Sequence, residues 1–111
     1  MRALAVWFSV ATFGLVPAFA GAAEWVRNPD QPSQWIDLSS RTPDDDVIRF
    51  NVSLSTDSDT GAASTAKDDV VIELMNCTSG KRTMILPMLD NDVRHLPTLG
   101  DNDPLRRLIC G

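Results

Sequence analysis

The sequence predicts a small α+β domain, with about five or six antiparallel strands in one sheet and one short C-terminal helix. Residues 47–55 alternate apolar with polar side chains, residues 69–77 contain a continuous apolar run, and residues 103–111 carry helix start and stop signals. Alternation with a period of two is typical of a strand with one buried face, and turn residues between such runs indicate a sheet. We therefore expect one sheet with one helix attached to it.

The N-terminal segment has the composition of a secretory signal peptide. Arg2 supplies a positive charge, residues 3–16 are apolar, and small residues follow up to Ala23. This order of charged, apolar and small residues is typical of an export signal that is later removed. We predict a signal peptide over residues 1–23 and one mature domain over residues 24–111, located in the periplasm, secreted or at the cell surface.

Two cysteines, Cys77 and Cys110, follow this export signal. In an exported chain, an even number of cysteines favours a disulfide over a metal site or a nucleophile, because the compartment is oxidising. We expect a disulfide that joins the middle of the chain to its end; two buried free thiols are the alternative. Closing a loop of roughly 34 residues stabilises a fold by about 3–4 kcal/mol in the chain-entropy model.

The first part of the mature chain is expected to be extended. Pro29 and Pro32 exclude a helix and indicate an extended segment with a turn. Residues 34–38 are expected to form a first short strand, and the acidic residues 44–46 a solvated turn. Residues 47–55 are the clearest strand, because their apolar members recur at every second position: Ile48, Phe50, Val52 and Leu54.

The second confident strand covers residues 69–77. Its continuous apolar run predicts a central strand that is covered on both faces. Strict alternation would place Glu73 on the same face as Cys77, among apolar neighbours. A β-bulge near Asn76 would remove this conflict, or Glu73 lies near the margin of the sheet.

The segment after Cys77 is expected to return as one more strand. Residues 78–82 are typical of a turn, and residues 83–86 of a strand that Pro87 either ends or confines to a sheet edge. Residues 88–100 are expected to be irregular, because they contain a proline and a glycine that disfavour a helix.

The C-terminal residues predict a short helix. Asp103 is suited to cap its N-terminus and Pro104 to occupy its first position, where no N–H is needed. Gly111 can end it. A helix this short needs tertiary contacts and the disulfide for its stability. Its apolar face would hold Leu105, Leu108 and Ile109.

Residues 56–67 contain no large apolar side chain and are expected to form a flexible connection. Asp57, Asp59 and Asp68 occupy positions one, three and twelve of a calcium-loop pattern. Position six, which is normally glycine, is Ala62, and strands rather than helices flank the segment. We expect a solvated loop without a metal; calcium binding is the alternative.

No residue set in the sequence indicates catalysis or a cofactor. His95 is the only histidine, and the two cysteines are expected to be paired, so a typical zinc site cannot form. No nucleophile stands in a recognisable motif. Trp25 and Trp35 are expected to be core or sheet-face residues, with a ligand platform as the alternative. We therefore expect a non-enzymatic protein without a cofactor.

The formal net charge is −5, which disfavours nucleic acid and anionic lipid surfaces as partners. After the signal, no apolar run approaches the ~18–20 residues that span a bilayer, so the mature chain is not expected to be membrane-integral. The expected partner is a host or envelope protein.

Four short segments of the mature chain form a characteristic layout. These are Trp25 close after the signal, the Trp-Ile-Asp-Leu-Ser-Ser run at 35–40, residues 72–82 with a cysteine followed by basic residues, and residues 105–110 with the second cysteine. This layout resembles the surface-adhesin protein E family of small exported bacterial proteins. The resemblance implies an antiparallel sheet whose concave face is covered by a C-terminal helix, which the disulfide holds.

The resemblance also implies a binding role. We expect a non-enzymatic exported binding module resembling bacterial surface adhesins, which would meet its ligand with the sheet or with residues 56–67. The alternatives are a periplasmic inhibitor of a host or competitor enzyme, and a structural envelope protein.

Overall fold

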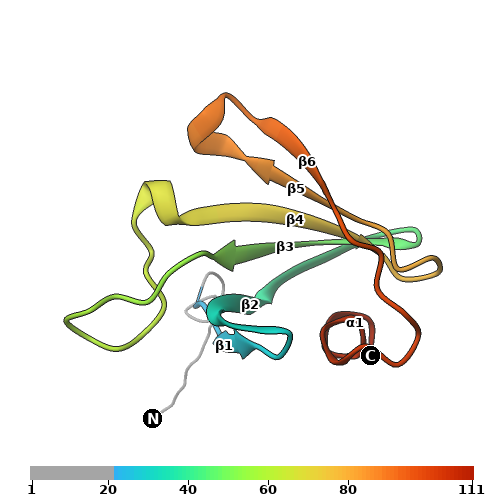
Figure 1. Ribbon diagram of the computed structural model, residues 1–111, viewed down its shortest axis with the longest axis horizontal. Helices are drawn as coiled ribbons and strands as arrows, with labels where there is room; N and C mark the ends of the chain where they lie inside the picture. The colour runs from blue at the N-terminus through green and yellow to red at the C-terminus, as the bar shows by residue number, and fades with distance from the viewer. Residues whose placement is uncertain (1–21) are drawn as a thin grey trace, which may run out of the picture.

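The computed structural model describes residues 22–111, which form a six-stranded antiparallel sheet and one α-helix (Figure 1). Each strand pairs with the next one in the sequence, so the order across the sheet is β1-β2-β3-β4-β5-β6. This architecture confirms the predicted fold class. Except for Ala22 and Ala23, the predicted signal peptide lies outside the described residues. The elements are β1 (Trp25–Asn28), β2 (Gln31–Asp44), β3 (Val47–Ser53), the 3-10 turn η3 (Lys67–Asp69), β4 (Val70–Asn76), β5 (Arg82–Leu86), the 3-10 turn η4 (Pro87–Leu89), β6 (Asp92–Leu96) and α1 (Pro104–Cys110).

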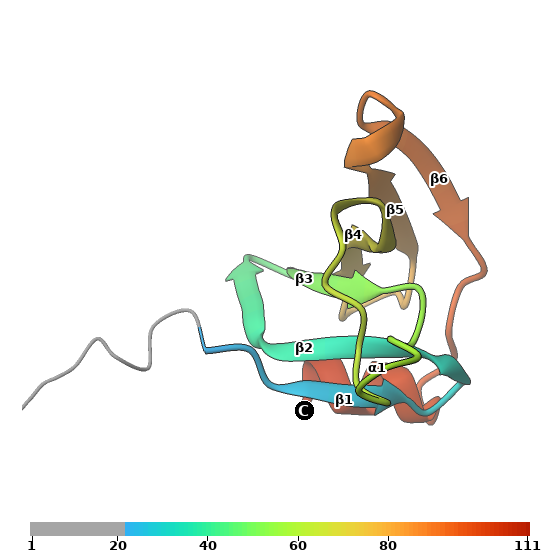
Figure 2. The ribbon, with the colours of Figure 1, turned by 90° about the vertical axis from the view of Figure 1, so that its left-hand side faces the viewer.

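The core lies between α1 and one face of β2, β3 and β4. Leu105 and Ile109 point from α1 into this core, as the predicted helix face requires. Figure 2 shows that the sheet bends, so that β5 and β6 rise away from β1, β2 and α1. The helix therefore covers only part of the sheet. The buried apolar cluster consists of Ile36, Phe50, Val52, Val71, Met75, Leu105 and Ile109.

Strand β2 is much longer than the predicted strand at residues 34–38. Its pairing with β3 shifts register between Asp37 and Thr42, so part of the ladder is missing there. Side chains replace the missing bonds: the Ser40 hydroxyl donates to the carbonyl of Asp37 at 2.6 Å and accepts from the N–H of Asn51 at 2.8 Å. Ser40 therefore bridges an irregularity within the strand.

Strand β4 is central, but its predicted burial on both faces is wrong. One face is buried and the other is half-exposed, because α1 packs against only one side of the sheet. The register between β3 and β4 runs without a shift from Val47↔Asn76 to Ser53↔Val70, so the bulge near Asn76, one of the two alternatives, is absent. Glu73 does not lie near the margin of the sheet either, since β4 lies between the strands β3 and β5. The buried residues of β4 are Val71, Glu73 and Met75.

The segment predicted to be irregular, residues 88–100, contains the strand β6. It pairs with β5 from Leu86↔Asp92 to Arg82↔Leu96. The turn before it uses left-handed backbone at Asp90 (φ 54°) and Asn91 (φ 60°), a conformation that these two residue types tolerate. The prediction was wrong because β6 is an exposed edge strand with little apolar patterning. Strand β5 ends where Pro87 begins η4, and it is not an edge strand.

Candidate binding groove

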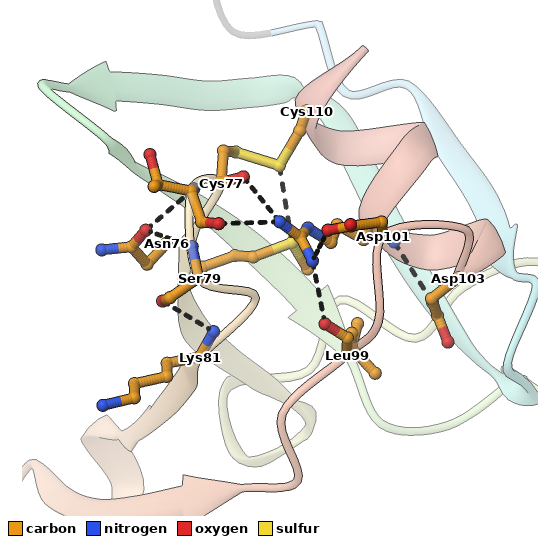
Figure 3. Close-up of polar contacts among 11 residues, drawn as sticks. Asn76, Cys77, Ser79, Lys81, Leu99, Asp101, Asp103 and Cys110 are labelled. Atoms are coloured by element: carbon orange, nitrogen blue, oxygen red, sulfur yellow. Dashed lines mark hydrogen bonds and ion pairs between the residues drawn. A yellow bond between two sulfur atoms is a disulfide. The ribbon is translucent and has the colours of Figure 1, made fainter.

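The predicted disulfide between Cys77 and Cys110 is present and joins α1 to the end of β4 (Figure 3). The two Cα atoms lie 5.8 Å apart. The predicted cap is confirmed as well: the Asp103 carboxylate accepts a hydrogen bond from the N–H of Leu105 at 2.8 Å. Because so short a helix is unstable alone, its position depends on the disulfide and on the burial of Leu105 and Ile109.

Arg106 provides a second attachment, which the sequence did not indicate. Its residue surface is only 8% exposed. The guanidinium donates to the carbonyl oxygens of Leu99, Cys77 and Thr78, each at 3.0 Å, and lies 3.0 Å from the Asp101 carboxylate (Figure 3). A buried cation is tolerated only with such partners. Arg106 therefore connects α1 to both the β4–β5 turn and the segment that precedes the helix.

Gly80 brings that segment close to the β4–β5 turn. The N–H of Leu99 donates to the carbonyl of Gly80 at 3.0 Å, and Gly80 adopts φ +79°. A Cβ atom at this position would overlap the carbonyl oxygen of Leu99 and lie 3.0 Å from the Arg106 guanidinium. We call Cys77, Gly80, Leu99, Arg106 and Cys110 together the tail clasp.

Replacing Gly80 with alanine is expected to lower the free energy of unfolding by about 2 kcal/mol, from the left-handed backbone and the overlap with Leu99. Chemical denaturation measures this change. Gly61→Ala is a matched control for the backbone alone, because Gly61 has φ +71° with no atom within 4 Å of its Cβ position. Gly100→Ala, with neither strain nor close contact, should leave stability nearly unchanged. Equal losses at Gly80 and Gly61 would show that close packing in the tail clasp contributes nothing.

A groove of about 550 Å³ lies between β1 and α1. Figure 2 shows β1 at the border of the sheet, alongside the helix. Pockets of several hundred Å³ with mostly apolar walls and a few polar groups are the usual form of ligand sites. This groove is therefore the candidate binding site. Its lining residues are Val26, Arg27 and Pro29 from the sheet side, and Pro104, Arg107, Leu108 and Gly111 from the helix side.

Three arginines lie in or near the groove although the chain as a whole is acidic. Arg107 lines it and forms no ion pair with any residue in the range 22–111. Arg41 donates to the carbonyl of Leu108 at 3.3 Å, near the end of the helix. The Arg27 guanidinium instead lies over the Trp35 ring, 4.2 Å from its centroid. Arg107 is thus the cation best placed to meet an anionic group in the groove.

Asp30 and Asp103 are neighbouring carboxyl groups that respectively follow Pro29 and precede Pro104, two residues of the groove lining. Burial and the contact with Asp103 raise the pKa of Asp30. Burial alone would also raise the pKa of Asp103, but the bonds from Asp30 and from backbone N–H groups outweigh it and lower that pKa. The fold therefore shifts the pKa values of these two carboxyl groups in opposite directions.

Glu73 is the other titratable group that the fold perturbs. It is 2% exposed and lies in the sheet between Phe50 and Met84. Arg82 is its ionic partner, with Nη1 3.5 Å from Oε2. Burial raises the pKa of Glu73 to about 7, and the opposing effect of Arg82 is too weak to cancel the shift. Because it is sealed in the core, Glu73 acts on stability rather than on a ligand.

The calcium-loop pattern does not assemble into a ligand cluster. The Asp57 carboxylate is turned onto its own loop, where it accepts the N–H groups of Asp59 at 2.8 Å and Thr60 at 3.3 Å. Asp68 lies in η3. No group of three or more His, Cys, Asp or Glu side chains within residues 22–111 is arranged to hold a metal ion.

Trp25, Trp35 and His95 lie outside the groove lining. Trp35 donates from Nε1 to the Thr56 hydroxyl at 3.0 Å, which fixes the start of the long loop. Trp25 is half-buried on β1. His95 is exposed on β6, opposite Thr83. Trp25 and Trp35 therefore act as sheet-face residues in this structure.

Comparison with known proteins gave no match: no family model fits the chain, and no curated protein or solved structure is significantly similar to it. Within the described part of the chain, no helix is long and apolar enough to cross a membrane. The groove and the tail clasp are therefore the observations from which a function can be argued.

Proposed function

We propose that this protein is a non-enzymatic exported binding module and that the groove between β1 and α1 receives its ligand. The observation that carries the proposal is the groove itself, in which Val26, Pro104 and Leu108 form apolar walls around the cation of Arg107. The ligand is then a surface of a host or envelope protein that offers an apolar contact next to a carboxylate. A charge-assisted bond from a guanidinium to a carboxylate gives such a contact direction as well as affinity.

The tail clasp supports this function because it fixes one wall of the groove in advance. The disulfide and the three carbonyl bonds of Arg106 hold α1 in place without a ligand. A site that is already formed loses less conformational entropy when it binds. The groove can therefore bind without first ordering the helix.

Export is the setting that we propose for this binding. Residues 1–23 have the pattern of a signal peptide, and a disulfide persists best in an oxidising compartment. The layout that resembles the surface-adhesin protein E family supports the same role. The protein would then act in the periplasm, after secretion or at the cell surface.

Affinity capture with matched charge variants tests the proposed function. The immobilised oxidised protein is exposed to envelope extract and to host matrix proteins, beside the variants Arg107→Glu and Arg49→Glu. Arg49 is an exposed residue of β3 outside the groove, so both variants change the net charge equally. A specific partner should be retained by wild type and Arg49→Glu, and should bind Arg107→Glu at least about tenfold more weakly. Equal retention by all three proteins would show that the groove is not the binding site.

A further inference from the structure

The border of the sheet at β1 has unpaired backbone groups. Strand β1 pairs with β2 on one side, and no strand among residues 22–111 covers the other side. The N–H of Leu38 donates to the carbonyl of Glu24 at 2.9 Å. This bond shows which backbone groups next to and within β1 are directed toward β2. In an antiparallel pair, successive residues direct their backbone groups alternately toward and away from the neighbouring strand. The backbone groups of Glu24 and Val26 therefore point toward β2, whereas the N–H and C=O groups of Trp25 and Arg27 point away from it.

The groove borders this free edge, because Val26 and Arg27 of β1 line it. The Arg27 guanidinium itself lies over the Trp35 ring. Pro104 and Leu108 form the opposite wall. An extended chain placed here would find hydrogen-bonding partners on the sheet side and apolar contacts on the helix side.

We propose that an extended peptide segment of a partner protein adds to the sheet along β1 and places an acidic side chain on Arg107. This inference rests on the proposed function, because it fills the same groove. The outward groups of Trp25 and Arg27 are separated by two residues, which is the repeat of the bonds that an added strand makes. An extended strand can pair with both residues at once, and its side chains alternate between the two faces of the sheet. The segment therefore carries apolar side chains at alternate positions and at least one Asp or Glu.

The opposite edge of the sheet differs from β1 in charge. Four of the five residues of β6 are exposed, and Asp92 and Arg94 form an ion pair at 2.6 Å on it. Exposed charges on an edge strand discourage pairing with another chain. Strand β1 lacks such protection, because its single charged side chain, Arg27, is fixed over a ring. This difference in exposed charge between the two edge strands favours β1 as the edge to which a peptide adds.

Peptide selection on the oxidised protein tests this inference. Octapeptides from a random library are selected for binding, and the tightest is measured on wild type, Arg107→Glu and Arg49→Glu. We expect the enriched peptides to alternate apolar residues with at least one acidic residue. Their affinity should fall at least about tenfold in Arg107→Glu and little in Arg49→Glu. Failure to enrich any peptide that depends on Arg107 would overturn the inference.

Amide hydrogen exchange supplies a readout specific to strand addition. On peptide binding, exchange at the N–H groups of Trp25 and Arg27 should slow by about tenfold or more, because these groups gain partners. The N–H of Val26 already faces β2 and should change little. N-methylation of the peptide at alternate residues should abolish binding in one register and spare it in the other.

The two proposals fail in different ways. If capture of a partner depends on Arg107 but exchange at Trp25 and Arg27 is unchanged, the groove binds in another manner: strand addition is excluded and the binding function stands. If Arg107-dependent peptides protect these N–H groups while no envelope or host protein is captured through the groove, strand addition stands and the proposed class of partner fails.

Discussion

Replacing Cys110 with serine is expected to lower the free energy of unfolding of the oxidised protein by about 3–4 kcal/mol. The bond to Cys77 connects residues that are 33 positions apart, so it restricts the unfolded chain strongly. In the folded state it also anchors a seven-residue helix that supplies two residues of the core. Thermal or chemical unfolding under non-reducing conditions measures the loss.

Three comparisons isolate the disulfide in this experiment. The variants Cys77→Ser and Cys77→Ser/Cys110→Ser should lose about as much stability as Cys110→Ser, because each removes the same bond. Wild type treated with a thiol reductant should approach the same value. Ligand binding in the groove should weaken in every case, since α1 forms one of its walls. Identical unfolding of wild type with and without reductant would contradict the prediction.

Raising the pH through 7 is expected to destabilise the fold through Glu73. Burial raises the pKa of this carboxyl from 4.5 to about 7, so the folded protein retains a proton that the unfolded chain has released. The stabilising contribution of the protonated carboxyl is fully present below pH 4.5 and is lost as the pH rises through about 7. Over this range the change amounts to about 3 kcal/mol.

Glu73→Gln should remove this pH dependence, because an amide keeps the shape and the polar contact with Arg82 but does not ionise. Denaturant unfolding at several pH values between 4 and 8.5 measures the slope for each variant. Glu24→Gln is the matched control, since Glu24 is the other glutamate of the chain and is exposed. The control should retain the wild-type slope. A Glu73→Gln variant whose stability falls as steeply as wild type would refute the role of this residue.

Elements with strong local signals could be predicted from the sequence. Strand β3 was predicted by strict alternation, although two residues too long at its C-terminal end. Helix α1 was predicted by the cap at Asp103 and the proline after it, because these signals act within one turn and need no distant partner. The disulfide followed from the even number of cysteines in a chain with a predicted export signal.

Elements that depend on the sheet around them were predicted less well. Strand β6 has an exposed surface and therefore little hydrophobic patterning, so only its pairing with β5 reveals it. The extension of β2 depends on bonds between Ser40, Asp37 and Asn51, which lie up to 14 residues apart when counted along the chain. Irregular pairing of this kind leaves no periodic signal.

The groove could not be predicted, because it joins β1 to a helix at the other end of the chain. Arg106 and Arg107 are neighbours with the same side chain, yet one is buried in the tail clasp and the other lines the groove. Leu108 was assigned to the core-facing side of the helix, but it is half-buried and contributes to the groove instead. The rotation of α1 about its axis decides all three positions, and only its packing against the sheet sets that rotation.

The sequential order of the strands has a consequence for how the chain folds. Strands β1 to β6 can pair one after another, because each strand needs only the one that precedes it in the sequence. The apolar face of β2, β3 and β4 nevertheless stays in water until Pro104–Cys110, which follows all six strands in the sequence, covers it. A premature stop codon or a proteolytic cut just before this segment would therefore leave a paired sheet with its apolar face exposed to water. Such a species is prone to aggregate.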